Sequence, residues 1–157
     1  KIYSAVLSNH LPDNAEQEVT EVYISLPIGQ DIKSAIHIKQ SVNPLGKTCQ
    51  THFREIKKMG DYSLVEVRTY TGRTHQIRVH AAHLGCAIVG DKLYGLPNDG
   101  FINWLSEGDD YLRAQNFPLH RQLLHALEIR FPHPVTTEEV VIRAEDKNLI
   151  SELNQSL

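Results

Sequence analysis

Residues 71–85 read TGRTHQIRVHAAHLG, and in this stretch the chain changes from a strand pattern to a helix pattern. The apolar positions recur at i, i+4 and i+7, the spacing of one helix face: Ile77, Ala81 and Leu84. Thr74 is the expected N-cap, and Gly85 is the expected C-terminal stop. We therefore predict a short helix between Thr74 and Gly85, entered directly from a strand.

The rest of the chain is dominated by strand patterns. Turn residues stand at 43–46 and 59–61, and the acidic segment 100–117 contains a short expected helix at 101–105. A last helix is expected over 147–157, capped by Asp146. The expected strands cover residues 1–8, 19–26, 35–40, 48–57, 62–70, 87–89, 123–131 and 139–144. Many strands with few helices predict an α+β fold, with a central mixed, mostly antiparallel β-sheet and flanking helices.

Composition and charge restrict the class of protein only loosely. The formal net charge is −3, divided into +2 over residues 1–95 and −5 over residues 96–157, so a local basic surface fits a protein that is not basic overall. No apolar run approaches the roughly 20 residues that cross a bilayer. Cys49 and Cys86 form no C-x-x-C pair and are expected to be reduced thiols in a cytoplasmic protein.

Two arginines in the opening stretch call for anionic partners. Arg73 lies in the turn ahead of the helix, where free N–H groups favour anions, and its planar fork suits a phosphate or a carboxylate. Arg78 lies between two apolar residues and is expected to be partly buried, which costs several kcal/mol unless the guanidinium is paired. Its partner comes from elsewhere in the fold, from a ligand, or from a part of the protein outside this chain. The alternatives are a solvated turn arginine for Arg73 and a side chain that extends to water for Arg78.

Three histidines in the same stretch raise the question of a metal site. Zinc-binding helices place two histidines at i, i+4 with an acidic residue nearby, whereas His75, His80 and His83 are spaced by five and three without an acid. Packing and hydrogen bonding are the better interpretation, and a metal-dependent hydrolase is the least favoured function. A Ser-His-Asp or Cys-His arrangement stays open at this point.

Four blocks of the sequence carry a resemblance to a known family. GRTHQIRVHAAHLGCAIVGDKLYG, from Gly72, closely resembles the signature segment of RNA pseudouridine synthases of the RluA family. KIYSA, from Lys1, resembles the family's K-x-Y-x-A strand, and GKTCQTHFREI, from Gly46, resembles its G-K-x-A-x-T-x-F segment. RQLLHALEIRFPHP, from Arg121, is similar to its closing strand. The blocks keep the family order across nearly the whole chain.

The resemblance implies an activity and a set of site residues. Enzymes of this family isomerise uridine to pseudouridine within ribosomal or transfer RNA, without a metal or an organic cofactor. By motif, Arg78 matches the arginine that pairs with the catalytic aspartate, and Tyr3 matches the tyrosine that stacks on the base and helps in proton transfer. Substrate binding is implied for the signature residues Arg73, Thr74, His75, Gln76 and Ile77.

The chain departs from the family pattern at one motif. The catalytic aspartate of the family belongs to an H-R-L-D motif upstream of K-x-Y-x-A, and H-R-L-D does not occur in this sequence. We therefore expect residues 1–157 to be the C-terminal portion of a pseudouridine synthase domain and to be inactive without the upstream part. Asp91 is interpreted as a turn residue. RNA is the expected partner of a monomer that needs neither metal nor membrane, and the alternative function is that of a non-catalytic RNA-binding relative.

Overall fold

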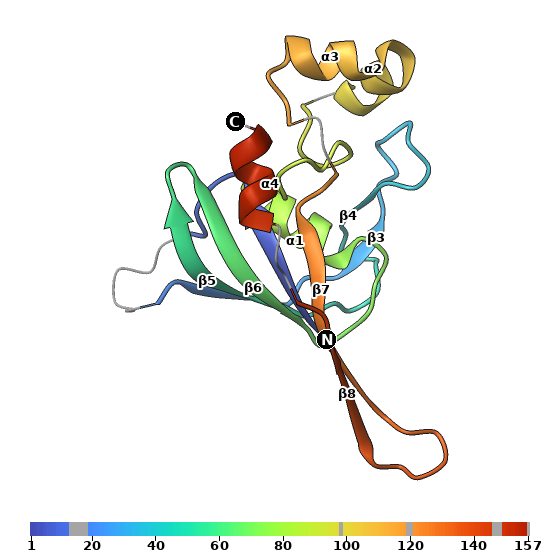
Figure 1. The fold of residues 1–157 in the computed structure, drawn as a ribbon. Coiled ribbons are helices and arrows are strands. Elements are labelled where there is room, and N and C mark those ends of the chain that lie inside the picture. Colours follow the sequence, from blue (N-terminus) through green and yellow to red (C-terminus); the bar gives the residue numbers. More distant parts are fainter. Residues whose placement is uncertain (13–18, 98, 119–120, 146–148, 157) are drawn as a thin grey trace.

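The computed structural model describes residues 1–12, 19–97, 99–118, 121–145 and 149–156 (Figure 1). The strands are β1 (Ile2–Leu7), β2 (Glu21–Ile24), β3 (Ile28–Gln30), β4 (Gln40–Val42), β5 (Thr51–Met59), β6 (Tyr62–Thr69), β7 (Leu124–Pro132) and β8 (Glu139–Arg143). The helices are α1 (Gln76–His83), α2 (Gly100–Glu107), α3 (Asp109–Ala114) and α4 (Leu149–Ser156). No helix in these ranges is long and apolar enough to cross a membrane.

A six-stranded sheet in the order β2-β5-β6-β1-β7-β8 forms the centre of the fold. Every strand pairing recorded in the described ranges is antiparallel. The short strands β3 and β4 form a separate two-stranded sheet, and the β7–β8 hairpin extends beyond the body of the molecule (Figure 1). The predicted α+β architecture, with a mostly antiparallel sheet and flanking helices, is confirmed.

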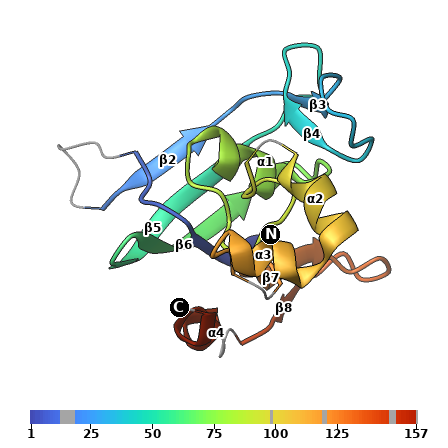
Figure 2. The same cartoon turned by 90° about the horizontal axis from the view of Figure 1, so that it is seen from above.

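The two faces of the sheet carry different helices. Side chains alternate along β1, so Tyr3, Ala5 and Leu7 belong to the core that includes Ile77 of α1. Val6 points the other way, into a second core with residues of α4. Figure 2 shows α1 and α4 on opposite sides of the sheet. The alternation of side chains along β1 therefore places Tyr3 on the same face of the sheet as α1.

Helix α1 ends as predicted but begins differently. Gly85 has a φ of 78°, and the N–H groups of Gly85 and Cys86 donate to the carbonyls of Ala82 and Ala81, which closes the helix in a Schellman motif. The predicted N-cap, Thr74, is wrong. His75 occupies the N-cap position with a left-handed φ of 55° and no side-chain cap bond. The chain enters the helix through a tight turn, in which the Gln76 N–H donates to the Arg73 carbonyl.

Other element boundaries also differ from the predictions. Residues 35–39 lie in turns closed by backbone bonds between Asp31 and Lys39, with Ile38 exposed, so the strand predicted over 35–40 is wrong and β4 begins only at Gln40. The strand predicted over 87–89 is reduced to one bridge between Leu7 and Ile88. Strand β3 and helix α3 were not predicted. Of the predicted last helix, the described part is α4, and its expected cap, Asp146, lies outside the described residues.

Candidate active site

A cavity of about 270 Å³, here called the site cavity, lies where β1, the end of β6 and the start of β7 meet α1. Six of the seven predicted site residues line it, and Thr74 lines a neighbouring cavity that shares Gly72 and Arg73 with it. The lining residues are Lys1, Tyr3, Thr69, Thr71, Gly72, Arg73, His75, Gln76, Ile77, Arg78, Gln122 and Leu124. The fold thus brings Tyr3 and Arg78 into one cavity although they are far apart in the sequence.

Arg78 has a carboxylate partner within the chain. Its Nε lies 2.7 Å from Asp91 Oδ2, and its Nη2 lies 2.8 Å from Oδ1, a bidentate pair. The Arg78 side chain is 17% exposed and that of Asp91 is 0% exposed. The predicted partial burial of Arg78 is confirmed, and the fold itself supplies one partner. Nη1 has no recorded partner in the described ranges, which leaves that side of the guanidinium available for a second anion.

Asp91 also has the turn role predicted for it. Its Oδ1 accepts hydrogen bonds from the backbone N–H groups of Leu93 and Tyr94, at 3.1 and 3.2 Å. The turn that follows Asp91 therefore fixes the carboxylate, and the carboxylate fixes the Arg78 guanidinium. The turn role of Asp91 was predicted from the sequence, whereas its pairing with Arg78 was not.

Tyr94 contacts both Arg78 and His75. The Arg78 guanidinium lies 4.9 Å from the Tyr94 ring centroid, a cation–π contact. Burial raises the pKa of Tyr94 to about 12, so its hydroxyl is protonated, and this hydroxyl forms a 2.9 Å hydrogen bond with His75 Nδ1. Burial, and then the charge of Arg78, lower the pKa of His75. Both effects favour the neutral form of His75.

Gln76 is buried and fastens the turn that precedes α1. Its Oε1 accepts from the Thr71 hydroxyl at 2.9 Å and from the Arg73 N–H at 3.0 Å. Its Nε2 donates to the Gln50 carbonyl at 2.8 Å and to Thr51 Oγ1 at 2.9 Å. All four hydrogen-bonding positions of the amide are in use. Gln76 therefore holds the wall of the site cavity in place, which is a structural role beside the substrate contact that the resemblance implies.

Tyr3 combines a packed ring with a hydroxyl that has no recorded partner in the described part of the chain. The ring packs against the core beneath α1 and lines the site cavity. A tyrosine face of this kind can stack on a base, while its free hydroxyl can exchange a proton with a bound group.

His80 lies behind the site in a buried network. Its Nε2 lies 3.1 Å from the Leu26 carbonyl, which can only accept, so Nε2 carries the proton. Its Nδ1 then accepts from the Thr51 hydroxyl at 2.8 Å, and Thr51 in turn accepts from Gln76. The neutral imidazole fits this pattern, because its Nδ1 can accept from the Thr51 hydroxyl. Burial accordingly lowers the pKa of His80.

This network predicts a pH dependence of stability. Because the pKa of His80 is lower in the folded state, the unfolded chain binds more protons in acid, and stability falls as pH drops below the ordinary value of 6.5. In His80→Gln, the slope of unfolding free energy against pH, measured by urea titration below pH 6.5, should be shallower by up to about 1.4 kcal/mol per pH unit. The exposed His37→Gln serves as the control, and an equal slope in wild type and His80→Gln would contradict the assignment.

Within the described ranges, the side chains considered for metal binding or nucleophilic catalysis do not gather at a cavity. No group of three or more metal-ligating side chains gathers in the described ranges. Ser63 Oγ does lie 2.8 Å from His10 Nδ1, but it is fully buried, lines none of the described cavities and donates directly to Glu55. Both cysteines are buried, and burial raises the pKa of the Cys86 thiol to about 11, far from a reactive thiolate.

The comparison with known sequences identifies the family. Residues 1–83 match the family model described as RNA pseudouridylate synthase, so the chain belongs to that family. It is 39% identical over 134 residues to an uncharacterized RNA pseudouridine synthase of Chloroflexus aurantiacus, covering 85% of this chain and 34% of the relative. It is 36% identical over 117 residues to ribosomal large subunit pseudouridine synthase D of Vibrio vulnificus, covering 74% and 35%. The chain thus spans about a third of the length of these relatives, and the predicted RluA type is confirmed.

Solved structures agree on the fold. Human RNA pseudouridylate synthase domain containing 1 superposes with a TM-score of 0.69 at 28% identity, covering 96% of this chain and 56% of that one. Human RNA pseudouridylate synthase domain containing 4 superposes with a TM-score of 0.60 at 19% identity, covering 98% and 60%, and this second likeness concerns the fold only.

Sequence reasoning missed several residues that shape the site. Lys1, Gln122 and Leu124 line the cavity from strands or strand ends, and Tyr94 holds Arg78 from the turn after α1. All four residues belong to blocks that carry the resemblance, but no local pattern indicates which side chains of a block face the cavity. Tyr3 was selected through the K-x-Y-x-A resemblance and not through such a pattern.

Proposed function

We propose that the full protein isomerises uridine to pseudouridine in ribosomal RNA and that residues 1–157 provide the uridine-binding side of its active site. The main support for this proposal is that Tyr3 and Arg78 line the same cavity of a pseudouridylate synthase fold. The similarity to ribosomal large subunit pseudouridine synthase D of Vibrio vulnificus favours the large ribosomal subunit as the source of the RNA. The cytoplasmic location expected from the reduced thiols is part of this proposal.

Each site residue has a task in this proposal. The target uracil is flipped out of its helix and stacks on the Tyr3 ring, which replaces the stacking that the base loses. Arg78, held by Asp91 and Tyr94, presents Nη1 to the nucleophilic carboxylate, which belongs to a segment upstream of Lys1. An arginine beside a carboxylate keeps it ionised and aimed, as a nucleophile in a dry site requires. Arg73 and the other signature residues form the wall that the ribose and phosphate contact.

The reaction itself provides the test. Isomerisation breaks the bond from uracil N1 to the ribose, forms a bond from C5 to the ribose, and releases the C5 hydrogen to water. RNA labelled with tritium at uridine C5 should therefore release tritium when treated with the full-length protein. Residues 1–157 by themselves should release none, and turnover by this isolated chain would contradict an upstream nucleophile. RNA binding without release by the full-length protein would favour the non-catalytic relative.

Tyr3 substitutions should separate stacking from proton transfer. Tyr3→Leu removes the ring and should raise KM by roughly fivefold to 100-fold, the equivalent of one base stack. Tyr3→Phe keeps the ring and should leave KM within about twofold of wild type while kcat falls, because only the hydroxyl is lost. Steady-state tritium release measures both constants. Equal KM values for the two variants would show that the base does not stack on Tyr3.

A further inference from the structure

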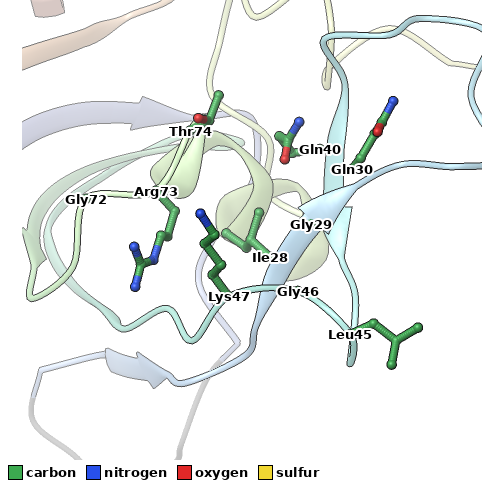
Figure 3. Close-up of a pocket in the computed structure, with 10 residues that line it drawn as sticks. All are labelled: Ile28, Gly29, Gln30, Gln40, Leu45, Gly46, Lys47, Gly72, Arg73 and Thr74. Atoms are coloured by element: carbon green, nitrogen blue, oxygen red, sulfur yellow. The ribbon is translucent and has the colours of Figure 1, made fainter.

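A second cavity, here called the hairpin cavity, lies beside the site cavity. It measures about 410 Å³ and lies between the β3–β4 hairpin and the turn that leads into α1 (Figure 3). Its lining residues are Ile28, Gly29, Gln30, Gln40, Leu45, Gly46, Lys47, Gly72, Arg73 and Thr74. The volume is within the range of about 300–1,000 Å³ that holds small-molecule ligands, so it suits one nucleotide-sized group.

The hairpin cavity is cationic. Lys47 and Arg73 line it, and none of its ten lining residues is acidic. Arg73 Nε donates to the Thr48 carbonyl at 3.0 Å, which anchors the guanidinium and leaves both Nη groups without a recorded partner in the described ranges. Figure 3 shows the Lys47 and Arg73 side chains on the same side of β3, although they come from separate segments. Lys47 and Arg73 supply two cations among amide and hydroxyl groups, and this composition suits a phosphate and its sugar.

The walls of this cavity are held rigidly. Ile28 and Lys47 exchange two backbone hydrogen bonds, of 3.0 and 2.9 Å, which fixes the start of the lysine side chain. Gly46 packs so closely against Ile28 that a Cβ at Gly46 would overlap the Ile28 backbone carbonyl. A preformed position of this kind lowers the entropy lost when a cation is placed on a ligand.

The two cavities are coupled through one side chain and one shared wall. The Tyr94 hydroxyl accepts from the Gln40 N–H of the hairpin at 3.0 Å and forms a 2.9 Å hydrogen bond with His75 Nδ1 of the site cavity. Gly72 and Arg73 line both cavities. A ligand that occupies the site cavity and continues past Arg73 therefore enters the hairpin cavity at once.

We propose that the hairpin cavity binds the phosphate and ribose of the nucleotide next to the target uridine, with Lys47 and Arg73 contacting the phosphate. This inference rests on the proposed function, because it needs a uridine of an RNA strand in the site cavity. A flipped nucleotide draws its neighbouring phosphates toward the protein, and phosphate contacts set the register of the strand. Lys47 thereby helps to position the uridine without touching it.

The experiment compares single charge removals in the full-length protein. Binding of a fluorescent oligouridylate is titrated at several salt concentrations for wild type, Lys47→Ala, Lys47→Arg and Lys57→Ala. Lys57 is also exposed, and it lies about 20 Å along β5 from Thr51, so its removal changes the net charge equally without touching the cavity. Tritium release from large-subunit ribosomal RNA is measured for the same four proteins.

Lys47→Ala should bind roughly two- to fivefold more weakly, and the slope of log affinity against log salt should lose about 0.7, the share of one single-strand phosphate. Lys47→Arg should restore the slope, and Lys57→Ala should match wild type. If wild type releases tritium but Lys47→Ala and Lys57→Ala bind alike, the inference is overturned while the proposed function stands. If wild type releases none, the proposed function fails, and the assignment of the cavity to a nucleotide beside a target uridine fails with it.

Discussion

Replacing Arg78 by alanine in the full-length protein is expected to lower kcat for the proposed uridine isomerisation by about 10³-fold, the upper range for the loss of one charge-stabilising donor. The guanidinium is already fixed by the bidentate pair with Asp91 and by the Tyr94 ring, and its Nη1 side is free for a second carboxylate. A group fixed in advance loses little entropy when it aligns a nucleophile, so its removal affects the reacting complex more than the binding of RNA. KM should change much less than kcat in the tritium assay.

The controls separate this catalytic effect from a folding defect. Arg78→Lys keeps the charge but not the fork, and it should recover only a small part of the activity because two contacts with Asp91 and one with the incoming anion need the planar group. Arg54→Ala removes an exposed arginine of β5 and should behave as wild type. Each variant is checked by circular dichroism and by its unfolding midpoint. A folded Arg78→Ala protein with wild-type kcat would remove Arg78 from the mechanism.

Most strands of the central sheet could be predicted because the residue pattern that favours a strand is local in the sequence. Strands β1, β5, β6, β7 and β8 contain the β-branched or aromatic residues that a sheet favours, and β5 and β6 also alternate in burial along much of their length. The predicted strand over 35–40 has the same alternation, yet its Ile38 is 59% exposed. In that segment, turns between Asp31 and Lys39 satisfy backbone N–H and C=O groups. The apolar side chain of Ile38 does not pack into a core there.

The site was predictable where it lay in one contiguous stretch and not where the fold assembles it. The run from Arg73 to Arg78 contributes most of the predicted residues, and five of those six line the site cavity. The partner of Arg78 could not be chosen from the sequence, since three sources were compatible with the same pattern. Asp91 reaches Arg78 because the chain turns back after the Schellman motif at Gly85, and backbone hydrogen bonds of residues 87–89 with the end of β1 hold that path.

Asp91→Ala is expected to lower the free energy of unfolding by about 3–5 kcal/mol, the cost of breaking a buried ion pair from one side. The substitution leaves the Arg78 guanidinium only 17% exposed and without its carboxylate, and it also removes the acceptor for the N–H groups of Leu93 and Tyr94. Asp91→Asn keeps an acceptor for those groups and should cost less. Asp110→Ala is the matched control, because its 2.6 Å pair with Arg113 is exposed on both sides and should contribute little.

A double-mutant cycle connects this stability effect to the origin of Arg78's partner. Arg78→Leu leaves the Asp91 carboxylate buried and unpaired, so each single variant is destabilised, whereas the variant with both changes loses both charges and should cost less than the sum of the two. Urea unfolding of the four proteins gives the coupling energy. Strong coupling means that Asp91 holds Arg78 whether or not a nucleophile is present, and the arginine is then preformed to receive the proposed upstream carboxylate. Additive effects would mean that Asp91 is a turn residue only, and that the pairing of Arg78 depends on the upstream segment or on the RNA.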